Sequence, residues 1–227
     1  KPNDDILPAR LYVDAVQIPG TSSIALLARA EGENPNAIVA FDPTNSDLKW
    51  QLDIPHSPNL QMTAANFGLV SVDAAPSFNG DLKLTVVTPD GEGVQTGLQV
   101  RADDEIFGPD SPNIKCQSDN PGAETDTCLV TFDEDPFEGS FGAMEVEVRS
   151  DGSVRVLRRT SFPNANLATF NTPQPFYLDG KPGVVYFSEP VEGGPYDVVV
   201  GLDLFGANNV VTLPQEHLAF PFDGIDS

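Results

Sequence analysis

The 227-residue chain has few residues of several kinds, and each shortage narrows what the protein can be. It has two cysteines, two histidines and one tryptophan. Two cysteines without matching histidines cannot make a zinc site of the ordinary four-ligand type. Basic side chains are also scarce, since 12 stand against 34 acidic ones and give a net charge of −22. Such a surface repels phosphate backbones and anionic lipids, so no nucleic acid or acidic membrane is expected as a partner.

Long apolar runs and catalytic motifs are missing as well. No apolar stretch approaches the length of a membrane span. There is no G-x-S-x-G elbow, phosphate-binding loop, H-E-x-x-H helix or dinucleotide glycine fingerprint. Only His56 and His217 could serve a histidine-dependent triad. With 34 acidic residues a glycosidase-like carboxylate pair stays open, but no pattern selects one, so the catalytic residues are unknown and no organic cofactor is predicted.

What the sequence does contain is a recurring hairpin, in which two apolar runs flank a turn rich in Gly, Asn, Asp or Pro. An aspartate falls near the end of the first run or in the turn each time, at a spacing of roughly 50 residues. A further apolar run precedes each hairpin, and a weaker segment precedes that run. The four hairpins are Ala37–Leu52, Leu82–Leu98, Met144–Leu157 and Tyr196–Leu213, with Asp42, Asp90, Asp151 and Asp203 as the recurring aspartates. The apolar runs are Ile24–Ala30, Leu69–Ala75, Cys128–Phe132 and Val184–Phe187, and the weaker segments are Leu11–Ile18, Leu60–Phe67, Glu105–Phe107 and Pro175–Leu178.

Four short strands per repeat predict an all-β, β-propeller-like fold of about four blades, each with four antiparallel strands. The alternative is two tandem β-sandwich domains. We interpret residues 1–227 as a single propeller-like domain. Its units span residues 9–54, 55–101, 102–162 and 163–215, and residues 216–227 are a closing strand or the start of a further blade. We expect this chain to be part of a larger propeller and, in isolation, to expose an apolar blade face.

Two stretches resemble known propeller repeats. The stretch AFDPTNSDLKWQ in the first unit resembles a quinoprotein-type repeat, in which an AxDxxT-like segment precedes a strand that carries tryptophan. The stretch TPQPFYLDGKPGVVYFSEP in the fourth unit resembles a TolB-like blade. These resemblances imply a propeller fold and carry no quinone-binding residues over. Alternation also predicts that Leu48, Trp50 and Leu52 share one face of a strand.

The only two cysteines, Cys116 and Cys128, bracket a loop rich in turn residues. This isolation and spacing predict a local disulfide, and with it a secreted, periplasmic or cell-surface protein. The densest acidic residues follow shortly afterwards in FDEDPFEG. Calcium takes six to eight oxygen ligands, so Asp133, Asp135 and Glu138 form a candidate calcium site, although the EF-hand spacing is absent. The alternative is a solvated acidic loop.

The absence of catalytic motifs together with the repeats favours a non-catalytic, secreted or surface binding domain for a protein or glycan partner. Further blades or another chain are additional partners to expect. The alternative is a propeller hydrolase, glycosidase-like, with carboxylates or calcium in a central pocket. The two differ in one observable respect, because the hydrolase requires carboxylates from at least three units to meet at one cavity.

Overall fold

A computed structural model describes residues 11–29, 35–55, 57, 59–74, 81–100, 110–135, 139–163, 165–168, 172–189, 196–206 and 209–213. All regular structure in these ranges is β-strand, and no helix long and apolar enough to cross a membrane occurs in them. Both histidines, residues 216–227 and the predicted segment Glu105–Phe107 lie outside the described residues.

In the described ranges, sixteen strands form four sheets, and each sheet is an antiparallel meander of four strands consecutive in the chain. The first sheet contains β1 Leu11–Gln17, β2 Ile24–Arg29, β3 Asn36–Phe41 and β4 Leu48–Ile54. The second contains β5 Gln61–Ala65, β6 Gly68–Ala74, β7 Asp81–Val87 and β8 Gly93–Gln99. The third contains β9 Asp110–Cys116, β10 Thr125–Asp135, β11 Ser140–Arg149 and β12 Val154–Phe162. The fourth contains β13 Gln174–Leu178, β14 Lys181–Ser188, β15 Asp197–Leu202 and β16 Asn209–Leu213.

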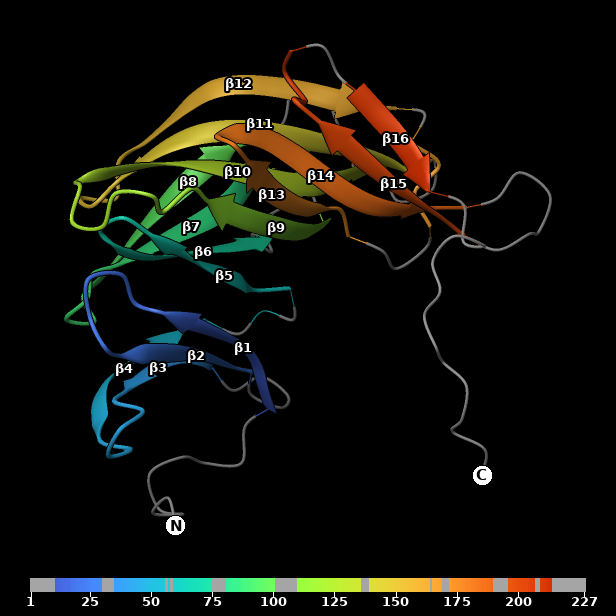
Figure 1. Cartoon of the computed structure of the whole chain (residues 1–227). Helices are drawn as coiled ribbons and strands as arrows, with labels where there is room; N and C mark the ends of the chain where they lie inside the picture. The colour runs from blue at the N-terminus through green and yellow to red at the C-terminus, as the bar shows by residue number, and fades with distance from the viewer. Residues whose placement is uncertain are drawn as a thin grey trace, which may run out of the picture.

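The four sheets stack in sequence order as the blades of a β-propeller-type arc (Figure 1). Contacts between neighbouring sheets join their first strands in the order β1, β5, β9 and β13. Figure 1 shows the first and fourth sheets at opposite ends of this arc. This order of packing differs from that of two separate sandwiches, so the propeller prediction is confirmed.

The middle strands of the first three sheets are the most deeply buried ones. Strands β3, β6 and β11 are buried along nearly their whole length, and β6 and β11 lie in sheets that have a neighbouring sheet on each face. Strands β3 and β6 read as nearly continuous apolar runs, whereas β11 alternates apolar residues with glutamate in MEVEV. The outer strands β4, β8 and β12 are largely exposed and carry most of the polar residues.

Three apolar cores fill the spaces between successive sheets. The first lies between the first and second sheets and includes Leu27, Ile38 and Leu69. The second lies between the second and third sheets, and the third core lies between the third and fourth. In the third core the Phe141 ring stacks on Phe162 at 4.5 Å between ring centroids.

The turns before the outer strands β8, β12 and β16 contact the outer strand of the preceding sheet. Gly91 has a positive φ of 88°, and a Cβ there would lie 2.7 Å from the Trp50 ring. Gly152 has a φ of 85°, and its Cβ would lie 2.5 Å from Val94. Glycine therefore serves at these turns both for its backbone freedom and for the close approach. The third contact of this kind is a cation–π pair, in which the Arg158 guanidinium lies 4.8 Å from the Phe205 ring.

The recurring aspartates have local roles in these turns. Asp42 accepts a hydrogen bond from the Thr44 N–H at 2.9 Å, and Asp151 accepts one from the Ser153 N–H at 2.8 Å. Bonds of this type stabilise a turn by imitating its backbone hydrogen bond. The hydroxyls of the same Thr and Ser donate to these carboxylates and lower the pKa of both aspartates. In these two hairpins the recurring aspartate therefore has a structural role, which is to stabilise the turn.

Two sequence interpretations need correction. The first strand of the third sheet is β9, Asp110–Cys116, and not the segment Glu105–Phe107. Its sequence, DSPNIKC, contains proline and too little apolar content to be recognised. Leu48 does not share the face of Trp50 and Leu52, because the register of the β3–β4 pair shifts next to it and leaves it 41% exposed.

Candidate functional site

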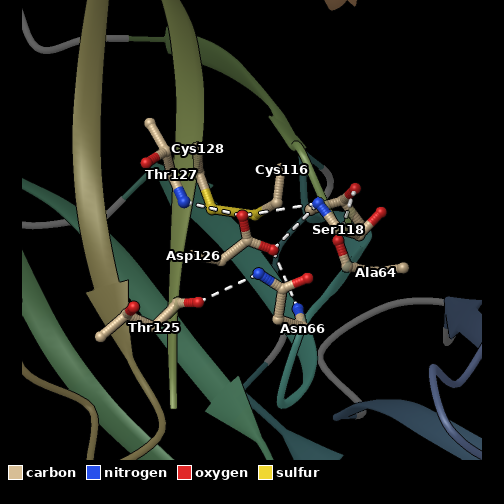
Figure 2. Close-up of a disulfide and its surroundings, with 9 residues drawn as sticks. Ala64, Asn66, Cys116, Ser118, Thr125, Asp126, Thr127 and Cys128 are labelled. Carbon is tan, nitrogen blue, oxygen red and sulfur yellow. Dashed lines mark hydrogen bonds between the residues drawn. A yellow bond between two sulfur atoms is a disulfide. The ribbon is translucent and has the colours of Figure 1, made fainter. Parts of the chain in front are cut away.

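A disulfide fixes the base of the β9–β10 hairpin. Cys116 and Cys128 are direct cross-strand partners, and their Cα atoms lie 3.9 Å apart (Figure 2). The predicted disulfide is therefore confirmed. It closes the loop of residues 117–127 against the sheet, so this loop is held at both ends.

Within this loop, the buried carboxylate of Asp126 collects three backbone N–H donors. Thr127 donates at 2.7 Å, Asn66 at 2.9 Å and Ser118 at 3.1 Å (Figure 2). Asp126 is 4% exposed. Burial raises the pKa of this carboxyl and outweighs the three N–H donors, which favour its charged form.

Asn66 links the second sheet to this loop of the third. Its side-chain amide donates to the Thr125 carbonyl at 3.1 Å, and its side-chain oxygen accepts from the Asn120 N–H at 2.8 Å. Its backbone carbonyl accepts from the Gly122 N–H at 2.6 Å. Together with the bond to Asp126, these contacts join the β5–β6 turn to the disulfide loop through one buried side chain and its backbone.

A groove lies beside this junction, and we call it the turn groove. It has a volume of about 480 Å³ and is formed by turns from the first three sheets. Its walls are mainly apolar, and polar groups stand among them. The lining residues are Pro19, Gly20, Thr21, Asn66, Phe67, Pro89, Pro121, Gly122, Ala123, Glu124 and Ser150.

A smaller cavity, the polar pocket, adjoins the turn groove and shares Asn66 and Ala123 with it. Its volume is about 210 Å³, and it contains the carboxylates of Asp119, Asp126 and Glu147. All three belong to the third sheet or its disulfide loop. In these two cavities, carboxylates from three different units do not meet as a propeller hydrolase would require.

The predicted calcium residues are only partly described. Asp133 lies in β10 and pairs with Phe141 of β11, at the opposite end of the strand from the disulfide. Glu138 and the side chain of Asp135 lie outside the described residues. In the part of the chain that the structure does describe, no three His, Cys, Asp or Glu side chains gather closely enough to hold a metal ion. Calcium binding stays a prediction.

Sequence reasoning missed Asn66 and the role of Asp126. The segment Leu60–Phe67 was interpreted as one strand, whereas β5 ends at Ala65 and Asn66 opens a two-residue turn. The pair Asn66 and Gly68 was a usable signal, because Gly68 has a φ of 145° and an added Cβ would lie 2.3 Å from the Val87 carbonyl. The contact with Asp126 joins residues 60 positions apart and leaves no local signal.

No protein-family model matches the chain, and no curated protein matches it either. Among solved structures, it is similar to a triple arginine-to-alanine variant of AofleA from Arthrobotrys oligospora. The identity is 12%, the TM-score is 0.55, and the match covers 92% of this chain and 58% of that one. This chain thus spans little more than half of that protein.

Two arabinanases also match. An exo-1,5-α-L-arabinanase from a bovine ruminal metagenomic library is 10% identical with a TM-score of 0.42, over 93% of this chain and 81% of that one. An α-L-arabinanase from Cellvibrio cellulosa, complexed with arabinohexaose, is 14% identical with a TM-score of 0.39. That match covers 90% of this chain and 78% of the arabinanase. At such identities a structural likeness concerns the fold alone, and the fold is a β-propeller.

Proposed function

We propose that this protein is a non-catalytic binding domain, secreted or at the cell surface, whose turn groove holds a segment of a glycan or protein. The observation that carries the proposal is the groove itself, about 480 Å³ in volume and built by turns from three successive sheets. Binding sites of small ligands are concave, mostly apolar and few in number, with a few placed polar groups. The turn groove has these properties.

The junction beside the groove makes it a rigid site. Asn66, Asp126 and the disulfide hold the β9–β10 loop, so a ligand need not order the wall that it contacts. Preorganisation of this kind increases affinity because less conformational entropy is lost on binding. The disulfide also supports the secreted or surface location, since disulfides persist in oxidising compartments.

The lining limits the ligand's charge. Glu124 stands in the groove, Asp119 stands in the adjoining pocket, and none of the lining residues of either cavity is basic. An anionic sugar or acidic peptide would be repelled. Neutral oligosaccharides fit best, because their C–H faces can pack on Pro19, Pro89 and Pro121 while their hydroxyls reach Glu124.

A second candidate is the glycosidase-like hydrolase, and one observation favours it. Asp126 has a raised pKa and shares the polar pocket with Asp119 and Glu147. Glycoside hydrolysis uses one carboxyl that stays protonated near a second that is ionised. Against this role, three backbone N–H groups already occupy the Asp126 oxygens.

An array of neutral, acidic and cationic oligosaccharides and peptides tests the proposal. We expect selective binding of neutral glycans that Ala123→Trp, which fills the groove, weakens at least tenfold. Ala15→Trp, at an exposed alanine of β1, is the matched control and should bind normally. Binding that survives Ala123→Trp would place the ligand elsewhere. Release of reducing sugar that is abolished by Asp126→Asn while binding persists would instead support the hydrolase.

A further inference from the structure

Within the described part of the chain, the fourth sheet has one face that no other sheet covers. The pairing registers place Val185, Val200 and Val211 side by side on it, and Phe187, Val198 and Leu213 in the next row. Phe176 belongs to the same face, because a Cβ on Gly183 would lie 2.4 Å from its ring. We call it the free face of the fourth sheet, and it comprises Phe176, Leu178, Val185, Phe187, Val198, Val200, Leu202, Val211 and Leu213.

The opposite face of the same sheet is a normal blade interface. Val184, Tyr186 and Val199 are buried there against Leu129 and Phe141 of the third sheet. In the first three sheets, the face that corresponds to the free face is covered by the next sheet in the chain. The free face therefore has the composition of a covered blade face.

Exposure among the described residues is concentrated at this sheet. Ten large apolar side chains are exposed, and four of them lie on the free face: Leu178, Phe187, Val211 and Leu213. Contiguous apolar patches on this scale mark interaction surfaces. The one charged residue that the register places on the free face is Lys181, at its end, where it pairs with Asp203 at 3.3 Å.

We propose that the free face is an interface between two copies of this chain, which pack free face to free face about a twofold axis. Two four-stranded faces about 20 Å across would bury on the order of 1,000 Å² in total, which reaches the lower range of specific interfaces. The surface is self-complementary, as a twofold contact requires, because it is apolar and nearly uncharged.

A head-to-tail contact with the first sheet is less favourable. On the outward face of that sheet, Ala28 and Ala37 are 0% exposed and Val39 is 2% exposed. These residues offer little area to a second molecule. The self-packing of the free face therefore gives a closed dimer and no open chain of molecules.

The charge of the protein gives the dimer a particular salt dependence. Each copy carries a net charge of −22, and this repulsion acts at long range while the interface itself is apolar. Salt screens the repulsion and leaves apolar burial intact, so the dimer tightens as salt rises. An interface held by ion pairs would loosen under the same change.

Sedimentation equilibrium of the 1–227 chain at 0.05 M and 1 M NaCl tests the proposal. We expect a monomer–dimer equilibrium that tightens in high salt. Val211→Glu should raise the dissociation constant roughly 10- to 100-fold, because it places an unpaired charge in the interface. Val156→Glu is the matched control, since Val156 is 45% exposed and Val211 is 46% exposed, both on outer strands.

Each other outcome overturns the proposal. A monomer at all concentrations and salts would show that the free face serves a different partner, such as a further blade. Assemblies larger than a dimer would show a head-to-tail contact. If Val211→Glu leaves the dimer intact, the dimer interface lies on another surface of the molecule. Circular dichroism melting of both variants confirms that they fold, because both replaced side chains are exposed.

Discussion

The third and fourth sheets share one core but differ on their other sides. The third sheet is covered on both faces, and the arginines of its outer strand pair with glutamates, as Arg155 does with Glu147 at 3.2 Å. Among the residues that the structure describes, another sheet covers only one face of the fourth sheet, and its outer strand, NVVTL, has no charged residue. Each of the two sheets has apolar side chains on both of its faces. The difference shows that a neighbouring sheet decides which apolar face is covered, and that composition alone does not.

The largest expected effect compares two adjacent residues on opposite faces of the fourth sheet. Tyr186 is buried with its ring 5.1 Å from that of Phe141, whereas Phe187 is 46% exposed. Tyr186→Ala should lower the free energy of unfolding by about 3–5 kcal/mol, because it leaves a cavity in the core. Phe187→Ala should lower it by only about 1 kcal/mol in dilute solution, because about half of that side chain is already exposed. Urea unfolding at low protein concentration measures both, and equal losses would show that Phe187 is covered in the single chain.

The next effect concerns the disulfide, which the third sheet has and the described part of the fourth lacks. Replacing both Cys116 and Cys128 by alanine should lower the free energy of unfolding by about 2–3 kcal/mol, since the closed loop is short. The midpoint of urea unfolding should fall accordingly. As a control, a reducing agent should lower the midpoint of the native protein and leave that of the double variant unchanged. Equal midpoints with and without reduction would contradict the prediction.

The smallest effect concerns Asp126. Asp126→Asn should cost about 1–2 kcal/mol, because an amide cannot accept all three backbone N–H bonds. The folded-state pKa of Asp126 is raised, so its stabilising contribution is full below the unfolded-state pKa and falls as pH rises through the folded one. The decrease in the free energy of unfolding caused by Asp126→Asn should thus be larger near pH 3.5 than at pH 7. Asp90→Asn, at an exposed position of the β7–β8 turn, is the control. If the decrease in unfolding free energy instead grows with pH, the three N–H donors outweigh burial and the Asp126 pKa is not raised.

The sequence predicted the hairpins well because their signals are local. Turn residues at Asp90–Gly91 and Asp151–Gly152 and the apolar runs beside them lie within a few positions of each other. The strand β9 was missed because its apolar content is too low. The exposure of Leu48 was missed because a register shift cannot be read from alternation.

The candidate site was predicted only at its disulfide. The two cysteines stand out in the sequence because the chain has no others. The contacts of Asn66 with Asp126 and Thr125 span 60 and 59 positions, so they arise from the packing of one sheet on another. The groove has the same origin, since turns from three sheets form it. Residues whose role arises from the packing of distant segments show no recognisable pattern in the local sequence.

The stacking of the sheets also has a consequence for how the chain folds. Every sheet is made of consecutive hairpins, and its contacts run to the sheets next to it in the chain. Each sheet can therefore form as a local unit during synthesis and then be stabilised by the one before it, as in repeat proteins. In such an array, each sheet is stabilised by its contacts with the sheets next to it. Among the described residues, the first and fourth sheets each have one such neighbour and the second and third have two, so in a single chain unfolding should begin at an end sheet and travel inward.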